Sequence, residues 1–327
     1  MDVLMQWGVG IILALQKIPG LTSLMKAFTF LGNKEFFIFI MPAVYWCIDT
    51  SLGARLAFMV ISSNGLNSLF KIALHLPRPY WIDTRVQALS SETSYGIPSG
   101  HAMNAVAIWG FLAAQMRKGW TWVAAVALVL LISLSRLYLG VHFPTDVFAG
   151  WVLGILLLVV MLAIERPVVG WFRKRTLWQQ IGIALAAALI YLGVYGGILA
   201  ALAPTPDPVE WEQNAAAVIA PEPGETATDP RSLEDGLTIA GMILGFGLAF
   251  ALGTHRPTGF DAKGPILKRL LRFGVGVVGV AILWLGIKLL TPDDPLALTA
   301  VLRFVRYTTV IFWVMYAAPW TFVKLKL

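Results

Sequence analysis

Several apolar runs in this chain are long enough to cross a lipid bilayer, and this constrains its fold more than any other feature. About 20 mostly apolar residues in a helix span the hydrocarbon core, and a helix also satisfies the backbone hydrogen bonds that lipid cannot. The sequence predicts nine spans, at about 35–49, 53–75, 101–116, 120–137, 144–164, 178–203, 236–253, 273–290 and 301–323. We therefore expect an all-α fold, a polytopic membrane helical bundle.

The composition excludes several other classes of protein. Only 13% of the residues are charged and the mean hydropathy is +0.74, whereas soluble proteins carry about 25% charged residues. The net charge of +7 is then explained by basic cytoplasmic loops, and no nucleic-acid partner is expected. The single cysteine, Cys47, excludes an intramolecular disulfide and a cysteine-based zinc site. Asp2 stands without a basic leader, so no cleaved signal peptide is expected.

Loop charges predict the orientation of the spans. Lysine and arginine gather in alternate loops, at 117–118, 166–175, 256–272 and 324–326. Because positive loops face the cytoplasm, the loops 76–100 and 138–143 and the segment 204–235 are expected on the external face.

The chain divides into four expected parts: N-terminal helices at the interface (1–34), a transmembrane core (35–203), an external linker (204–235) and a three-span extension (236–327). The linker is rich in proline and alanine and carries one basic residue, Arg231, against the acidic residues Asp207, Glu210, Glu212, Glu222, Glu225, Asp229, Glu234 and Asp235. Such a composition is typical of a flexible segment.

Candidate chemistry begins at the turn Pro98-Ser99-Gly100-His101, which opens directly into an apolar helix. Serine caps helices, and the amide groups of a helix N-terminus bind anions. A histidine beside such a site can donate or accept a proton. Capping alone also explains the turn.

Two cations precede this turn. Lys71 and Arg78 are seven residues apart, which places them on one side of a helix that Pro77 and Pro79 end at the external boundary. The alternative is that both side chains only extend from the helix end to water.

A third polar group follows the fourth expected span. Arg136 closes that apolar run, His142 follows, and Asp146 lies one helical turn after His142. A carboxylate at this spacing can hold one imidazole N–H, leave the other ring nitrogen free to attack, and stabilise the imidazolium. Alternatively, Asp146 only favours a helix N-terminus.

Together the segments read Lys71-x6-Arg78-Pro79, Pro98-Ser99-Gly100-His101 and Ser135-Arg136-x5-His142-x3-Asp146. This resembles the three-part signature of the type 2 phosphatidic acid phosphatases, or lipid phosphate phosphatases, whose superfamily includes glucose-6-phosphatase and the vanadium haloperoxidases. All eleven signature positions match. The resemblance implies a six-helix phosphatase core within 35–203 plus about three extra C-terminal helices, and says nothing about the linker or the extension.

The resemblance also implies roles. His142 would take the phosphoryl group as a phosphohistidine, Asp146 would orient it, and His101 would protonate the leaving oxygen and then activate water. The phosphate oxygens would be bound by Lys71, Arg78, Ser99, Gly100 and Arg136. Three cations and a helix N-terminus can stabilise a phosphoryl-transfer transition state, so no metal ion or other cofactor is expected. Two histidines in different surroundings predict a bell-shaped pH–rate profile.

The expected function is an integral membrane phosphatase acting on a lipid phosphate or diphosphate at the external face of an inner or plasma membrane. The substrate is left open among undecaprenyl diphosphate, phosphatidic acid, phosphatidylglycerophosphate and sphingoid-base phosphates. One alternative is a lipid phosphotransferase with the same site. Another is a non-enzymatic lipid transporter, although a transport path would place polar groups near the midplane. The extension could form a homo-oligomer or control lipid access, and the sequence favours neither.

Overall fold

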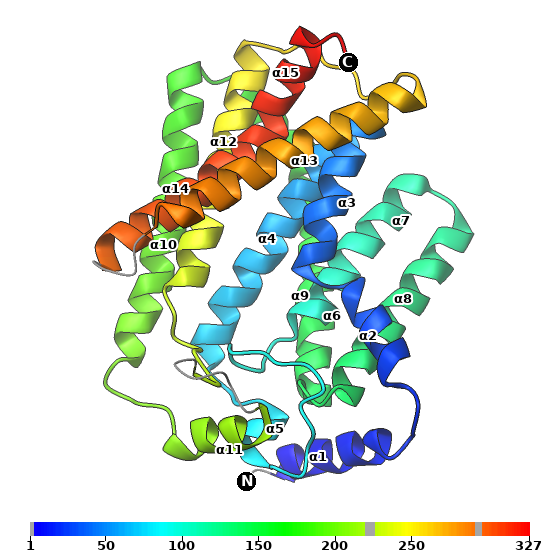
Figure 1. The fold of residues 1–327 in the computed structure, drawn as a ribbon, viewed down its shortest axis with the longest axis vertical. Coiled ribbons are helices and arrows are strands. Elements are labelled where there is room, and N and C mark those ends of the chain that lie inside the picture. The colour runs from blue at the N-terminus through cyan, green and yellow to red at the C-terminus, as the bar shows by residue number, and fades with distance from the viewer. Residues whose placement is uncertain (1–2, 220–225, 292–295) are drawn as a thin grey trace. The chain divides into compact units, whose positions relative to one another are not determined.

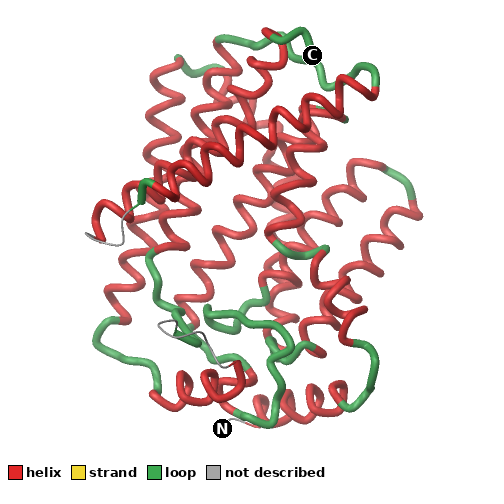
Figure 2. Tube along the Cα trace, viewed as in Figure 1, coloured by secondary structure: helices red, strands yellow, loops and turns green. Residues whose placement is uncertain are grey.

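The computed structural model describes residues 3–219, 226–291 and 296–327, and all regular structure within them is helical (Figures 1 and 2). The expected all-α fold is confirmed. In chain order the elements are α1 (Val3–Gln16), α2 (Thr22–Phe30), α3 (Lys34–Cys47), α4 (Thr50–Leu74), α5 (Pro79–Ile82), α6 (Gly100–Asn104), the π-helix η1 (Ala105–Trp109), α7 (Gly110–Met116), α8 (Gly119–Tyr138), α9 (Pro144–Arg173), α10 (Leu177–Leu202), α11 (Val209–Ile219), α12 (Glu234–His255), α13 (Ile266–Leu289), α14 (Leu296–Phe312), the π-helix η2 (Trp313–Ala317) and α15 (Ala318–Lys324).

Within the described residues, seven helical segments are long and apolar enough to cross a membrane: Thr50–Ile82, Gly119–Tyr138, Pro144–Arg173, Leu177–Leu202, Glu234–His255, Ile266–Leu289 and Ala297–Lys324. The spans expected at 35–49 and 101–116 are also helical, as α3 and as the continuous run α6–η1–α7, but both are shorter than the seven. The chain is an integral membrane protein.

The contacts divide the chain into two compact units. Unit 1 comprises Met1–Phe36, Ser63–Leu162 and Gly197–Ser232, and unit 2 comprises Phe37–Ser62, Ala163–Gly196 and Leu233–Leu327. All the candidate site residues belong to unit 1.

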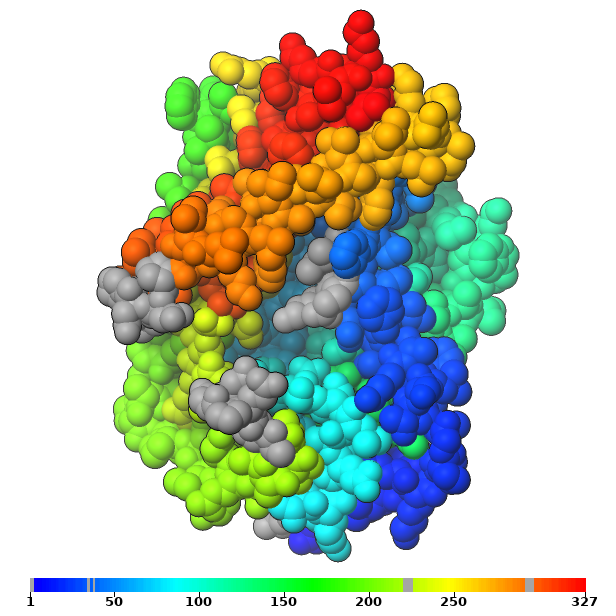
Figure 3. Space-filling view, viewed as in Figure 1, coloured from blue at the N-terminus to red at the C-terminus, as the bar shows by residue number. Residues whose placement is uncertain are grey.

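In unit 1 the loop after α4 folds against short helices. α1 and α2 pack on α8, and α11 packs on α5. Gln16 on α1 donates its side-chain amide to the carbonyls of Gln87 (2.8 Å) and Tyr138 (3.1 Å). Figure 3 shows the loop 79–98, in cyan, between the dark blue N-terminal helices and the yellow-green α11. Aromatic side chains from these elements, among them Tyr80, Trp81 and Tyr95, are almost fully buried in one apolar cluster. This cluster holds the loop in place.

The expectation of a flexible linker at 204–235 is wrong for its described residues. Residues 209–219 form α11, and Glu212 accepts hydrogen bonds from the Ala227 amide (2.9 Å) and the Thr228 hydroxyl. Burial of Trp211 against Trp81, with ring centroids 6.0 Å apart, overrides the local composition. Glu222 and Glu225 lie outside the described residues.

Unit 2 contains the C-terminal helices. α12 packs along α14, and a Cβ on Gly241 of α12 would lie 2.6 Å from the Phe304 carbonyl oxygen, so a small residue is needed there, as is common between membrane helices. Trp46 of α3 is buried and donates its ring N–H to the Val314 carbonyl at 2.9 Å. The C-terminal helices and residues 37–62 therefore share one packed core.

Candidate active site

Lys71 and Arg78 do not lie on one side of a single helix, as their spacing predicted, because α4 ends at Leu74. Lys71 lies in the last turn of α4, and its ammonium donates to the Ser94 hydroxyl (3.0 Å) and the Tyr95 carbonyl. Arg78 precedes α5 in extended backbone and donates from Nε to the Ser94 carbonyl (2.6 Å) and from Nη2 to the Ser94 hydroxyl (3.1 Å). Ser94 and Tyr95 therefore fix both cations.

Arg78 also contacts a histidine. Its side chain is fully buried, and Nη1 donates to the Val141 carbonyl at 2.9 Å while lying 3.4 Å from Nε2 of His142. The guanidinium thus faces the ring nitrogen that is expected to attack phosphorus.

The other ring nitrogen of His142 faces Asp146. Nδ1 lies 3.2 Å from Oδ2 of Asp146, and the same oxygen accepts the Phe143 backbone N–H at 2.9 Å. Because an ionised carboxylate only accepts hydrogen bonds, this contact places the proton of a neutral ring on Nδ1 and leaves the lone pair on Nε2. The predicted His–Asp contact is present in the structure.

The turn at 98–101 is tied to the same helix. Ser99 caps α6 by accepting the Ala102 N–H (3.5 Å) and donates its own N–H to the Asp146 carbonyl (2.9 Å). A Cβ on Gly150 would lie 2.6 Å from the Ser99 carbonyl oxygen, so the approach of α9 requires glycine there. His101 follows, with Nε2 2.5 Å from the Asn33 side-chain oxygen.

Arg136 completes the set of cations. Its buried side chain donates from Nη1 to the Thr29 hydroxyl (2.6 Å), and Nη2 forms an ion pair with Glu92. Its Nε is also buried and finds no hydrogen-bond partner in the described part of the chain. An unmet buried donor is costly, so this N–H is available to an incoming anion.

Glu92 is the acidic residue that sequence reasoning missed. Burial disfavours its charge, but the charges of Arg136, Arg78, His101 and Lys71 outweigh burial and lower its pKa. One carboxylate oxygen lies 3.8 Å from Nη2 of Arg78. Arg78 and Arg136, two of the groups expected to bind phosphate, therefore lie beside an anion in this structure. We call this region, comprising Lys71, Arg78, Glu92, His101, Arg136, His142 and Asp146, the phosphate pocket.

His142 lies in an environment that keeps it neutral. Burial, reinforced by the nearby charges of Arg78, Lys71 and Arg136, holds its pKa well below the usual value. A neutral imidazole is the nucleophilic form. In the described ranges no three histidine, cysteine, aspartate or glutamate side chains lie close enough together to hold a metal ion.

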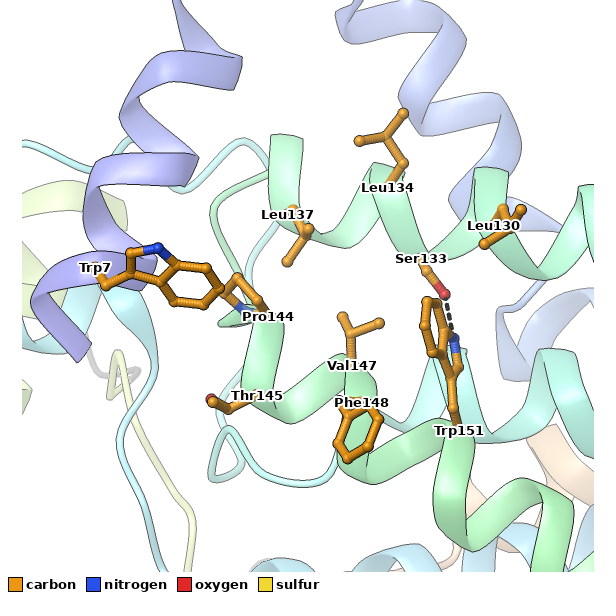
Figure 4. A pocket seen from close by; sticks show the side chains of 10 residues that line it. All are labelled: Trp7, Leu130, Ser133, Leu134, Leu137, Pro144, Thr145, Val147, Phe148 and Trp151. Carbon is orange, nitrogen blue, oxygen red and sulfur yellow. Dashed lines mark hydrogen bonds between the residues drawn. The ribbon is translucent and has the colours of Figure 1, made fainter. Parts of the chain in front are cut away.

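An apolar groove of about 500 Å³ lies among α1, α8 and the start of α9 (Figure 4). Its lining comes from α1, α8 and the start of α9: Trp7, Leu130, Ser133, Leu134, Leu137, Pro144, Thr145, Val147, Phe148 and Trp151. Trp151 donates its ring N–H to the Ser133 hydroxyl at 2.8 Å, which occupies two polar groups of the lining. Pro144 and Thr145 are the second and third residues after His142.

Known proteins resemble this chain over different lengths. Glucose-6-phosphatase 3 of Rattus norvegicus is 27% identical over 335 residues, covering 93% of this chain and 90% of the relative. Phosphatidylglycerophosphatase B of Bacillus subtilis is 28% identical over 163 residues, covering 46% and 78%. The crystal structure of the first transmembrane PAP2 type phosphatidylglycerolphosphate phosphatase from Bacillus subtilis is 25% identical, with a TM-score of 0.45, and covers 51% of this chain and 89% of that one.

Two family descriptions match separate parts of the sequence. The PAP2 superfamily matches residues 52–169, which contain the three motifs, and the transmembrane extension of PAP2 superfamily phosphatases matches residues 237–327. The predicted family is confirmed. The chain therefore contains a PAP2 superfamily domain and the transmembrane extension of PAP2 superfamily phosphatases, and it is a membrane phosphatase.

Proposed function

We propose that this phosphatase hydrolyses a lipid phosphate or diphosphate at the external membrane face, through a phosphohistidine on His142 and without a metal ion. The observation that carries the proposal is the geometry around His142, with Asp146 on Nδ1 and the buried guanidinium of Arg78 beside Nε2. This arrangement suits attack on a dianionic phosphate, whose charge Arg78 offsets next to the nucleophile.

In the first step Nε2 of His142 bonds to phosphorus. The phosphorus bond to the ester oxygen of a phosphate, or to the bridging oxygen of a diphosphate, breaks, and its electron pair leaves with that oxygen. His101, in its imidazolium form, gives that oxygen a proton and becomes neutral. Asp146 then faces an imidazolium phosphate, whose positive charge its carboxylate stabilises. In the second step His101 takes a proton from water, the water oxygen bonds to phosphorus, and the phosphorus–nitrogen bond breaks. Inorganic phosphate is released, and neutral His142 is restored.

The phosphate oxygens would replace the Glu92 carboxylate among the cations. The Nε–H of Arg136, which has no hydrogen-bond partner among the described residues, gives such an oxygen a donor, and Lys71 and Arg78 supply further charge. Ser99 and Gly100 would contribute through the hydroxyl and amide groups at the start of α6. Each charge-assisted contact is short and strong.

The groove supports a lipid substrate. Its apolar lining includes Pro144 and Thr145, the second and third residues after His142, which supports placing a hydrocarbon chain there while its phosphate is bound in the phosphate pocket. A sugar phosphate is the second candidate, because glucose-6-phosphatase 3 matches 93% of the chain, including the extension.

A phosphate-release panel decides between these substrates. Purified protein is assayed separately with each of the four lipid phosphate classes and with glucose 6-phosphate. Each assay is run with and without a chelator of divalent metals. We expect release from at least one lipid, unaffected by the chelator and inhibited by vanadate, which mimics the transferring phosphoryl group. Faster release from glucose 6-phosphate, or loss of activity with the chelator, would contradict the proposal.

Replacing Leu134 of the groove by tryptophan should separate substrates by chain length. Since the new ring fills space for a hydrocarbon chain, the KM of a long-chain lipid phosphate should rise by roughly three- to tenfold, while that of a short-chain analogue should not change. Val126→Trp is the control, since Val126 is exposed on the same helix outside the groove. Equal changes in KM for both substrates would show that the groove does not bind the hydrocarbon chain.

The acid limb of the pH profile of kcat/KM should lie below about 6.5, the ordinary imidazole pKa. His142 must be neutral to attack, and its lowered pKa extends the neutral form to lower pH. The charged and titratable groups around it are Lys71, Arg78, His101, Arg136 and Asp146. A phosphorothioate analogue, which ionises at lower pH than a phosphate, separates enzyme from substrate ionisation. An acid limb at or above the ordinary value with both substrates would contradict a neutral, buried nucleophile.

Phosphotransfer to a lipid hydroxyl would use the same residues. It would be revealed if the labelled phosphate were recovered on a lipid acceptor and not as inorganic phosphate. A non-enzymatic transporter is not supported, since the family is one of phosphatases. The four-part division at 1–34, 35–203, 204–235 and 236–327 stays a prediction, as does self-association through the extension.

A further inference from the structure

The segment after α10 reaches back to the loop that holds Lys71 and Arg78. Arg231 forms two bonds to the Asp207 carboxylate, from Nη2 to Oδ1 at 2.7 Å and from Nε to Oδ2 at 3.0 Å. It also donates to the carbonyls of Leu202 and Thr205, each at 2.7 Å. Arg231 therefore binds to residues 202–207 at the end of α10.

Tyr95 connects this segment to the phosphate pocket. Its buried hydroxyl donates to Asp207 (2.8 and 2.9 Å to the two carboxylate oxygens) and accepts the Nε–H of Arg231 at 2.9 Å. Burial and the bond to Asp207 raise the pKa of Tyr95 to about 12, so the hydroxyl keeps its proton. The carbonyl of the same residue accepts a hydrogen bond from Lys71. One residue thus contacts both the linker and a phosphate-pocket cation.

Further contacts hold the same two segments together. The Asp229 amide donates to the Thr93 carbonyl at 3.0 Å, one residue before Ser94. Asn214 on α11 donates to the Trp81 carbonyl at 2.9 Å, and Trp211 packs on the Trp81 ring. The loop at 93–95 is therefore held from the linker side as well as by Lys71 and Arg78.

We propose that Arg231, Asp207 and the Tyr95 hydroxyl are positioning residues that hold Ser94 and Tyr95 where they fix the phosphate-binding ends of Lys71 and Arg78. The inference rests on the proposed role of those two cations. Without the cluster, the loop at 93–95 can shift, and both cations lose the geometry that binds phosphate. Binding of phosphate then weakens, while the chemical step changes little, because Val141 still holds Nη1 of Arg78 beside His142 and Asp146 still holds Nδ1.

The test is a double-mutant cycle on the full-length protein. Tyr95→Phe removes only the hydroxyl and keeps the buried ring, and Arg231→Ala removes the partner. Each should raise KM and the vanadate inhibition constant by about tenfold and change kcat by less than about threefold. Because both act through one cluster, the double variant should resemble the single ones. Arg85→Ala is the matched control, since Arg85 is exposed on the same loop and pairs only with Asp83 among the described residues.

The outcomes separate this inference from the proposed function. Unchanged KM and vanadate inhibition in Tyr95→Phe and Arg231→Ala would overturn the inference, and so would effects that multiply in the double variant. If Arg231→Ala does not fold, Tyr95→Phe decides alone. If KM and vanadate inhibition stay native in these variants while a His142 variant is inactive, the positioning role of the cluster is rejected and the phosphatase mechanism stands.

Discussion

His142→Ala should lower kcat by about 10⁴-fold or more, because the covalent step loses its nucleophile and positioning alone remains. The ring is almost fully buried between Asp146 and Arg78, so its removal also leaves Asp146 without one partner. We expect a stability loss of about 1–3 kcal/mol, which is small enough for the variant to fold. Phosphate release at saturating substrate and the melting temperature measure the two effects.

His142→Gln keeps much of the volume and a hydrogen-bonding group, and it should be equally inactive. His255→Ala is the control, since His255 is exposed on α12 in unit 2. Near-native release by a folded His142 variant would show that the covalent step runs through another residue.

Arg78→Lys should lower kcat/KM by about 10²–10³-fold although the positive charge is kept. The guanidinium contacts the Ser94 carbonyl, the Val141 carbonyl and His142 in three directions. A lysine ammonium cannot reach all three, and it leaves buried carbonyls without donors. The loss should appear in both kcat and the vanadate inhibition constant, because Arg78 faces the nucleophile as well as the phosphate.

Arg85→Lys makes the same chemical change at an exposed position of the neighbouring loop and should stay within about twofold of the native enzyme. If Arg78→Lys also remained within twofold while folding normally, charge alone would suffice, and the fork-like contacts of Arg78 would have no catalytic role.

The sequence allowed the cations and histidines to be predicted because their spacing along helices is local information. His142 and Asp146 lie four residues apart across the start of α9. The prediction that Lys71 and Arg78 share one side of a helix is wrong, because α4 ends at Leu74 and Arg78 lies in extended backbone; their contacts with Ser94 bring them together instead. The His142–Asp146 relation depends only on local spacing and on Pro144, which begins the helix. Capping by Ser99 follows from the same local rules.

Glu92 and Tyr95 could not be predicted in this way. They lie in a loop without periodicity, and their partners Arg136, Asp207 and Arg231 are far away in the chain. The prediction of a flexible linker failed for a related reason. Its proline, alanine and acidic residues are typical of disorder, but Trp211 and Asn214 are ordered by packing against Trp81, which is a tertiary effect. Neither relation leaves a signal in local composition.

The most direct test of the central claim is rapid quenching of the native enzyme during turnover of a substrate labelled in its phosphate group, followed by peptide mapping. We predict an acid-labile, base-stable phosphoryl group on the peptide that contains His142, formed at least as fast as phosphate is released. His142→Gln should show no label. A phosphoryl group on another residue, or steady turnover without any labelled protein, would contradict attack by His142.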